Sequence, residues 1–150
     1  MNGRSMVYGD VPEIAALERM VNPHPWTETM FLEELRLGSL CRVLTKDSGT
    51  ITAYLVARLL WDEWHLLAVA VAPANRGLGL ARTLVQELIV HATQTAARAV
   101  MLEVRASNLP AANLYASLGF VPTGVRKNYY AGSYKAEDAI VMERRIARER

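Results

Sequence analysis

A glycine-containing turn offers the residue types of a phosphate-binding segment. The stretch VAPANRGLGLAR, residues 71–82, lies between an apolar run and a segment with helical periodicity. Gly77 and Gly79 let the backbone approach a ligand closely, and the first free N–H groups of the following helix point at one spot. Such a helix terminus carries about half a unit of positive charge and suits a phosphate or a diphosphate. Arg76 and Arg82 add fixed charge, so the stretch indicates an anion-binding loop.

Two other phosphate-binding motifs fit this turn less well. A P-loop ends in Gly-Lys followed by Ser or Thr, and that ending is absent here. A dinucleotide fingerprint wants a third glycine or alanine where Arg82 stands, and an acidic residue about twenty positions further on. Glu103 is near that distance, so the dinucleotide interpretation is weakened and stays open. A tight turn that binds no ligand also stays open.

Glu103 is the second candidate for chemistry. It lies in the β-rich run Ala99–Arg105, where Glu103 and Arg105 alternate with three apolar residues. Because side chains of a strand alternate between its two faces, Glu103 belongs to the face opposite those apolar residues. A carboxylate in such an apolar strand is costly unless it is wet or paired. Glu103 is therefore either a functional group or half of a strand-end salt bridge, with Arg105 or another neighbour as its partner.

The elements that would position these residues follow from periodicity and breaker residues. The expected order begins with two helices at 10–20 and 27–37, a hairpin of strands at 40–46 and 51–60, and a long strand at 64–71. It continues with a helix at 80–92, a strand at 99–105, a helix at 108–118 and two strands at 120–127 and 136–144. The run 64–71 is almost wholly apolar, as expected of a strand buried on both faces. The order predicts an α/β fold with a mixed central sheet, flanking helices and a parallel crossover from 64–71 to 99–105.

Local signals bound the first two helices. Asp10 and Glu13 have the spacing of a capping box at the start of the first helix. Thr27 is a candidate cap for the second helix, and Gly38 is placed to end it.

Composition restricts the class of protein. The 150 residues are 51% hydrophobic and 21% charged, which is typical of a globular chain, and they show no linker or repeat, so we expect one domain over 1–150. No apolar run has the length of a membrane span, and the first ten residues do not resemble a secretory signal. Cys41 is the only cysteine, which fits a reducing cytoplasm. The net charge of +2 gives no reason to expect a nucleic-acid partner.

Metal chemistry is not expected either. The three histidines, His24, His65 and His91, lack the spacing of metal ligands. His91 is predicted to lie at the surface of the helix 80–92. Cys41 lacks a neighbouring base in the sequence, so we expect a small buried thiol rather than a nucleophile that forms an acetyl-enzyme.

The turn and the order of elements together carry a family resemblance. Arg76-Gly77-Leu78-Gly79-Leu80-Ala81 is similar to the Gln/Arg-x-x-Gly-x-Gly/Ala signature of the GNAT acetyltransferases. In that family the signature follows the fourth strand, and its amides hold the diphosphate of coenzyme A. The resemblance implies a GNAT fold, acetyl-coenzyme A as co-substrate and no metal. It further implies that the coenzyme is held by Val69, Ala70, Val71, Arg76, Gly77, Leu78, Gly79, Leu80, Ala81, Arg82, Asn108 and Tyr115.

Further stretches narrow the resemblance to the bacterial RimI-type enzymes, over about residues 12–142. These stretches are His24-Pro25-Trp26, LEVRASN at 102–108, ANLYASLGF at 112–120, RKNYY at 126–130 and EDAIVM at 137–142. Such enzymes acetylate the N-terminal alanine of the eighteenth protein of the small ribosomal subunit. Asn75, where relatives often carry an aromatic residue, and Ser133-Tyr134-Lys135 depart from the pattern.

The resemblance assigns roles to individual residues. Glu103 becomes the general base, acting on the amine directly or through water, and Tyr115 becomes the acid beside the coenzyme sulfur. Backbone near Val71 would hold the oxyanion, where the fourth and fifth strands are expected to splay. Asn108 would contact the pantetheine or cap the next helix, and both possibilities stay open. Pro25 and Trp26 in the first interhelical loop, and Tyr129 and Tyr130 in the loop before the last strand, become walls of the peptide site.

Other functions share this fold. The same chemistry on a lysine or on a small amine is an alternative, because one scaffold hosts many substrates. A non-catalytic module that binds acetyl-coenzyme A is another, although the chain carries both Glu103 and Tyr115. A monomer or weak dimer is expected, with no membrane association.

Overall fold

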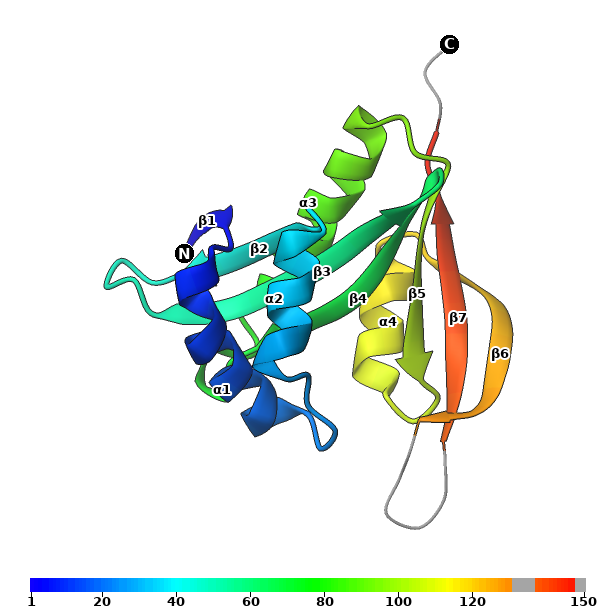
Figure 1. The fold of residues 1–150 in the computed structure, drawn as a ribbon. Coiled ribbons are helices and arrows are strands. Elements are labelled where there is room, and N and C mark those ends of the chain that lie inside the picture. The colour runs from blue at the N-terminus through cyan, green and yellow to red at the C-terminus, as the bar shows by residue number, and fades with distance from the viewer. Residues whose placement is uncertain (131–136, 148–150) are drawn as a thin grey trace. The chain divides into compact units, whose positions relative to one another are not determined.

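The computed structural model describes residues 1–130 and 137–147 (Figure 1). Its helices are η1 (Tyr8–Asp10), α1 (Val11–Val21), α2 (Glu28–Arg36), η2 (Pro73–Asn75), α3 (Leu80–Gln94) and α4 (Leu109–Ser117). Its strands are β1 (Asn2–Ser5), β2 (Leu40–Thr45), β3 (Ile51–Leu60), β4 (Glu63–Val71), β5 (Ala99–Arg105), β6 (Val121–Tyr130) and β7 (Glu137–Arg145). All the predicted helices and strands are present, and β1 is an addition that the sequence pattern did not predict.

Hydrogen bonds order the strands as β1-β2-β3-β4-β5-β7-β6 in a seven-stranded sheet. The first three residues of β4 pair in parallel with β5, through α3 as the crossover, and the pairs β1–β2, β2–β3, β5–β7 and β6–β7 are antiparallel. The prediction of an α/β fold with a mixed sheet and flanking helices is confirmed.

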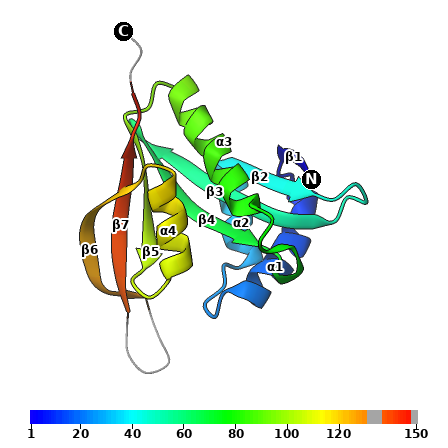
Figure 2. The ribbon, with the colours of Figure 1, turned by 180° about the vertical axis from the view of Figure 1, so that it is seen from behind.

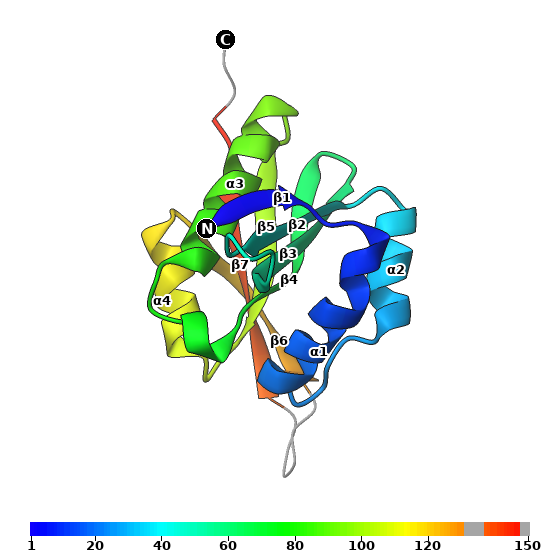
Figure 3. The same ribbon diagram turned by 90° about the vertical axis from the view of Figure 1, so that its left-hand side faces the viewer.

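One compact unit comprises Met1–Arg58 and Leu67–Leu88. In it α1 and α2 lie side by side (Figure 3), and their apolar faces contribute Ile14 and Phe31 to a core shared with Val43 of β2 and Tyr54 of β3. All four of these side chains are fully buried. The period-3.6 stripe of each helix therefore meets the buried face of the β2–β3 hairpin, as helix and strand amphipathicity require.

A second compact unit comprises Leu59–Leu66 and the described residues from Ile89 onward. Here β5, β7 and β6 run side by side, and α4 lies beside β5 (Figure 2). The burial of β5 alternates as predicted, because Val100, Leu102 and Val104 are buried while Glu103 is on the opposite, partly exposed face. β6 is the edge strand of this unit, and nine of its ten residues are exposed.

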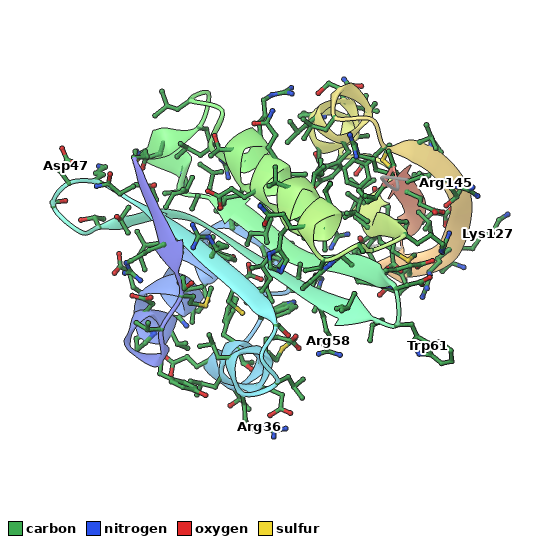
Figure 4. The ribbon with its side chains drawn as sticks, turned by 90° about the horizontal axis from the view of Figure 1, so that it is seen from above. Arg36, Asp47, Arg58, Trp61, Lys127 and Arg145 are labelled. Atoms are coloured by element: carbon green, nitrogen blue, oxygen red, sulfur yellow. The ribbon has the colours of Figure 1, made fainter. Side chains whose placement is uncertain are left out.

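Two turns contain a residue in the left-handed backbone region, a glycine in one and a tryptophan in the other. Gly49 adopts φ 92 at the β2–β3 turn and donates its N–H to Lys46 O at 2.8 Å; Figure 4 shows Asp47 at this tip. Trp61, also labelled in Figure 4, adopts φ 61 at the β3–β4 turn and is 97% exposed. The left-handed region favours glycine, so Trp61 holds an unusual conformation for a large side chain.

The predicted cap of the first helix is wrong, and the predicted cap and end of the second helix are confirmed. Asp10 does not form a capping box with Glu13; its carboxylate accepts instead from the Arg4 guanidinium at 2.7 and 2.9 Å and from the Val7 N–H at 2.8 Å. The 3-10 turn before α1 places Asp10 in a helical conformation, so its side chain cannot reach forward to α1. Thr27 caps α2 by accepting from the Met30 N–H at 3.2 Å, and Gly38 follows the helix at φ 78.

Candidate active site

The turn before α3 has the backbone of an anion-binding loop. Gly77 and Gly79 adopt φ 81 and 75, and a Cβ at either position would meet no atom within 4 Å, so the requirement for glycine is conformational rather than spatial. Within the described part of the chain, no backbone or side-chain acceptor is hydrogen-bonded to the N–H groups of residues 77–81. Arg76 is exposed beside them, and Arg82 is half-buried. These residues therefore fit a diphosphate, which needs several converging donors.

The second half of β4 leads into that turn with one face covered. Ala68, Ala70 and Ala72 pack against the core of the first unit. Leu67, Val69 and Val71 alternate with them, and Leu67 is 36% exposed while the two valines are half-buried. The prediction that residues 64–71 are buried on both faces is therefore wrong except at Trp64, because alternate residues face the core and the others do not.

Glu103 is held by two groups from β6. Its Oε1 lies 3.1 Å from Arg126 Nε, and its carboxylate accepts from the Tyr129 hydroxyl, which raises the pKa of Tyr129. The Glu103 side chain is 20% exposed and that of Arg126 is 55% exposed. The salt bridge that we considered for Glu103 thus exists, but Arg126 is the partner and Arg105 pairs with Glu137 at 3.4 Å instead. The carboxylate keeps limited access to solvent and is not a closed structural pair.

Tyr115 is buried in the second unit. Its ring packs against Phe120 with centroids 5.8 Å apart. Burial, with a smaller contribution from nearby Tyr130, raises the pKa of Tyr115 to about 12. Its hydroxyl therefore stays protonated at neutral pH and is available as a hydrogen-bond donor.

Tyr129 and Tyr130 link these groups. Both belong to the end of β6 rather than to a loop, so the loop placement is corrected: β6 continues past Lys127 through a register irregularity in which Asn128 adopts φ 56. Their rings meet edge to face at 5.1 Å. The Arg105 guanidinium lies 4.4 Å over the ring of Tyr130. Burial, and next the charge of Glu103, raises the pKa of Tyr130 to about 12.

Asn108 caps α4. Its side-chain oxygen accepts from the Ala111 N–H at 3.2 Å, which is the capping alternative for this residue. A role toward pantetheine is not tested by this contact, since the amide nitrogen of the side chain takes no part in the cap.

In the first unit, the loop between α1 and α2 presents Pro25 and Trp26. Pro25 is exposed and Trp26 is half-buried. The Trp26 ring packs on Phe31 with centroids 5.1 Å apart, and its backbone N–H donates to the buried carboxylate of Glu18 at 2.9 Å. The tryptophan is therefore held in place by both its ring and its backbone.

The remaining candidates for chemistry, Cys41 and His91, take part in the packing of the protein. Cys41 is buried, and burial raises the pKa of its thiol to about 11, which opposes a nucleophilic role. His91 is half-buried with its ring 4.9 Å from that of Trp64, so its surface placement is wrong. Among the described residues there is no cluster of three or more His, Cys, Asp or Glu suited to a metal ion, and no helix is long and apolar enough to cross a membrane.

The second unit thus gathers Glu103, Tyr115, Tyr129 and Tyr130, and the first unit holds the glycine turn with Trp26 in its own loop. Sequence reasoning gave no role to Arg126, although it opens the RKNYY stretch. Glu18 was predicted only as part of a helix. The departure at Ser133-Tyr134-Lys135 lies outside the described residues.

The profile of the acetyltransferase (GNAT) family matches residues 11–120, so the chain belongs to this family of acetyltransferases. The prediction of an acyltransferase with a GNAT fold is confirmed, and the match takes in residues of both units. A single domain over 1–150 stays a prediction.

Particular relatives share most of the chain. It is 35% identical to the [ribosomal protein bS18]-alanine N-acetyltransferase of Escherichia coli K12 over 89% of each chain. It is 33% identical to the putative enzyme of that name from Bacillus subtilis, over 93% of this chain and 91% of the relative. The crystal structure of the Escherichia coli ribosomal-protein-S18-alanine N-acetyltransferase superposes with a TM-score of 0.92 at 33% identity, covering 99% and 96% of the two chains. The resemblance to RimI-type enzymes is confirmed.

Proposed function

We propose that this protein transfers an acetyl group from acetyl-coenzyme A to the N-terminal α-amino group of ribosomal protein bS18, at its alanine. The observation that carries the proposal is the 35% identity, over 89% of both chains, to an enzyme named for that reaction. A protein that modifies a ribosomal protein works where ribosomes are made, so we propose that it is located in the cytoplasm. We further propose that it is a monomer or a weak dimer.

The glycine turn is proposed to hold the diphosphate of acetyl-coenzyme A. The left-handed Gly77 and Gly79 leave the following N–H groups free for phosphate oxygens, and Arg76 and Arg82 supply charge. Val69, Ala70 and Val71 are proposed to pair with the pantetheine like an added strand, next to the half-open apolar face of β4. The remaining contacts in this proposal come from the amides of Leu78, Leu80 and Ala81 and from the side chains of Asn108 and Tyr115.

The proposed reaction is direct attack in a ternary complex. The amine nitrogen bonds to the thioester carbon, the C–S bond breaks, and the amine proton leaves to Glu103 directly or through water. Backbone near Val71 holds the oxyanion. An α-amino group has a pKa of about 8, so a carboxylate is a sufficient base near neutral pH, whereas lysine at about 10.4 would ask more of it. Pro25, Trp26, Tyr129 and Tyr130 are proposed to contact the peptide.

Tyr115 is proposed to assist the departing thiolate. Its pKa of about 12 exceeds the value of about 8.5 for an ordinary thiol. The Tyr115 hydroxyl is therefore the weaker acid, and its main contribution is a hydrogen bond to the developing negative charge on sulfur. A hydrogen bond to a charged group contributes about 1.5–3 kcal/mol, so Tyr115→Phe is expected to lower kcat by about 10- to 100-fold.

The test is mass spectrometry of acetyl transfer to two peptides with the N-terminal sequence of bS18. One has a free α-amino group; the other has that group blocked and carries an internal lysine. We expect acetylation of the free terminus alone, with kcat reduced about 100-fold or more in Glu103→Gln because general base catalysis is lost, and reduced less in Tyr115→Phe.

The other outcomes identify the alternatives. Acetylation of the blocked peptide would assign the activity to lysine. No product on either peptide, together with measurable binding of acetyl-coenzyme A, would leave a small amine or a non-catalytic module as the function.

A further inference from the structure

A carboxylate without a cationic partner lies in the core of the first unit. Glu18 is 4% exposed, and among the ion pairs of the described residues none includes it. Its Oε2 accepts from the Asn22 side-chain amide at 3.1 Å and from the Trp26 backbone N–H at 2.9 Å. Its Oε1 accepts from the hydroxyl of Tyr54, which is fully buried. The charge is thus compensated by hydrogen-bond donors alone.

Those donors come from the loop between α1 and α2 and from β3. Asn22 also accepts from the His24 N–H at 3.0 Å, so one amide side chain bridges Glu18 to the centre of the loop. The contacts close into a ring: Glu18 holds the Trp26 backbone, the Trp26 ring packs on Phe31, the Phe31 ring meets Tyr54 edge to face at 5.6 Å, and Tyr54 donates to Glu18. The conformation of the loop thus satisfies all four groups at once.

A buried carboxylate is a costly way to anchor a loop, because apolar residues of similar volume stabilise a core as well or better. Its benefit is specificity of conformation, since a charged acceptor fixes both the direction and the number of its donors. Here the fixed object is Trp26, which packs against the core and is half-buried. A rigid, half-buried aromatic group is suited to anchor a peptide at small entropic cost.

We infer that Glu18, with Tyr54, is a positioning residue for the acceptor peptide: it holds the α1–α2 loop so that Trp26 presents a fixed surface to the substrate. The inference rests on the proposed function, because it deepens the role of the loop in that function. It assigns Glu18 to peptide recognition and gives it no part in the transfer of the acetyl group.

The matched pair of variants is Glu18→Leu and Glu34→Leu. Glu34 is also a buried carboxylate of the same unit, 5% exposed, but its partners are Arg58 and Ser39 and it does not contact the loop. We expect Glu18→Leu to raise the KM for the free-terminus bS18 peptide by about tenfold, because a loosened loop must be ordered on binding. The KM for acetyl-coenzyme A and kcat are expected to change less than about twofold, and Glu34→Leu is expected to spare all three constants.

Two gentler variants remain informative if the leucine variants do not fold. In Glu18→Gln the amide oxygen can accept from Trp26 and Asn22 while the NH₂ group donates to the Tyr54 oxygen, so near-normal KM is expected. Tyr54→Phe removes only one donor and keeps the ring packing, and a smaller rise in the peptide KM is expected. A peptide KM that is unchanged in both Glu18→Leu and Tyr54→Phe, or raised equally in Glu34→Leu, would overturn the inference.

Hydrogen exchange at the Trp26 amide tests the anchor without any activity. Slow exchange is expected in the wild type and in Glu34→Leu, and fast exchange in Glu18→Leu. Unchanged protection in Glu18→Leu would refute the positioning role. If the wild type does not acetylate the peptide, the proposed function fails, while the exchange measurement still decides whether Glu18 holds the loop.

Discussion

At the scale of single residues, the contact between Glu103 and Arg126 bears on the proposed binding of the substrate. The pair is 3.1 Å apart, but the Arg126 side chain is more than half exposed. Exposed ion pairs contribute about 0–1 kcal/mol, so this contact is easily exchanged for another cation. The ammonium form of a peptide N-terminus is such a cation, and we therefore expect Arg126 to compete with the substrate for the carboxylate of Glu103.

Arg126→Met is expected to lower the KM for the bS18 peptide by about threefold, with folding stability changed by less than about 0.5 kcal/mol. Steady-state kinetics at low and high salt measure the effect. Lys127→Met is the matched control, because it removes the same charge from the adjacent, exposed position of β6, and it is expected to leave the KM unchanged. A higher KM in Arg126→Met would mean that Arg126 contacts the substrate instead of competing with it.

At the scale of elements, the turn between η2 and α3 combines left-handed glycines with the proposed diphosphate site. Gly79 and Gly38 both adopt left-handed φ angles, 75 and 78, and at both positions the space that a Cβ would occupy has no atom within 4 Å. An L-residue in this region costs about 1–2 kcal/mol, so Gly79→Ala and Gly38→Ala are expected to destabilise the fold by similar amounts. Gly38 ends α2 and has no assigned ligand, which makes it the control.

Gly79→Ala is expected to weaken acetyl-coenzyme A binding by about fivefold or more, since strain at the start of α3 redirects the N–H groups that follow. Calorimetric titration measures the binding, and urea unfolding measures the stability. Equal affinities of the two alanine variants would argue against the turn as the diphosphate site.

Prediction from sequence succeeded where the signal is local. The alternation of Ala99–Arg105, the glycines of the turn and the cap at Thr27 each depend on residues a few positions apart, and each is found in the structure. It failed where the partner is remote or where a neighbouring turn changes the direction of a side chain. Arg126 follows Glu103 by more than twenty residues, and Tyr54 of β3 lies 36 residues after Glu18.

Asp10 shows the second kind of failure. Its spacing to Glu13 is that of a capping box, but the short 3-10 turn before α1 aims the carboxylate back at Arg4. The direction of the Asp10 carboxylate cannot be predicted from sequence periodicity, because it depends on the path of the preceding strand. For the same reason Tyr129 and Tyr130 were expected in a loop: the irregularity at Asn128 hides the continuation of β6.

At the scale of the whole molecule, buried tyrosines and the buried Cys41 thiol determine how stability depends on alkaline pH. Burial raises the pKa of Tyr115 to about 12, and burial together with the hydrogen bond to Glu18 raises the pKa of Tyr54 well above its usual range. In the unfolded chain both return to about 10. A raised pKa in the folded state contributes stability that is fully present below the unfolded pKa and is lost as the pH rises through the folded pKa.

The free energy of unfolding is therefore expected to fall above about pH 10 by about 1.4 kcal/mol per pH unit for each of the two tyrosines. A further loss begins at about pH 8.5, because the buried Cys41 thiol, with a pKa of about 11 in the folded chain, ionises earlier in the unfolded chain. Urea unfolding at a series of pH values measures this slope. The double variant Tyr54→Phe, Tyr115→Phe is expected to have a lower free energy of unfolding at neutral pH. Its free energy of unfolding is also expected to fall less steeply above about pH 10, because the contribution of the two tyrosines is lost. An equal slope in the double variant would assign the alkaline loss to other groups.

The buried thiol of Cys41 bears on how the protein meets oxidants and electrophiles. With a pKa of about 11, only about one thiol in ten thousand is ionised at pH 7, and the thiolate is the reactive form. Peroxide, alkylating drugs and disulfide exchange should therefore all act slowly on the only cysteine of the chain. We therefore expect the thiol to stay reduced in storage without added reductant, and a cysteine introduced at the surface to accept a spectroscopic label almost alone.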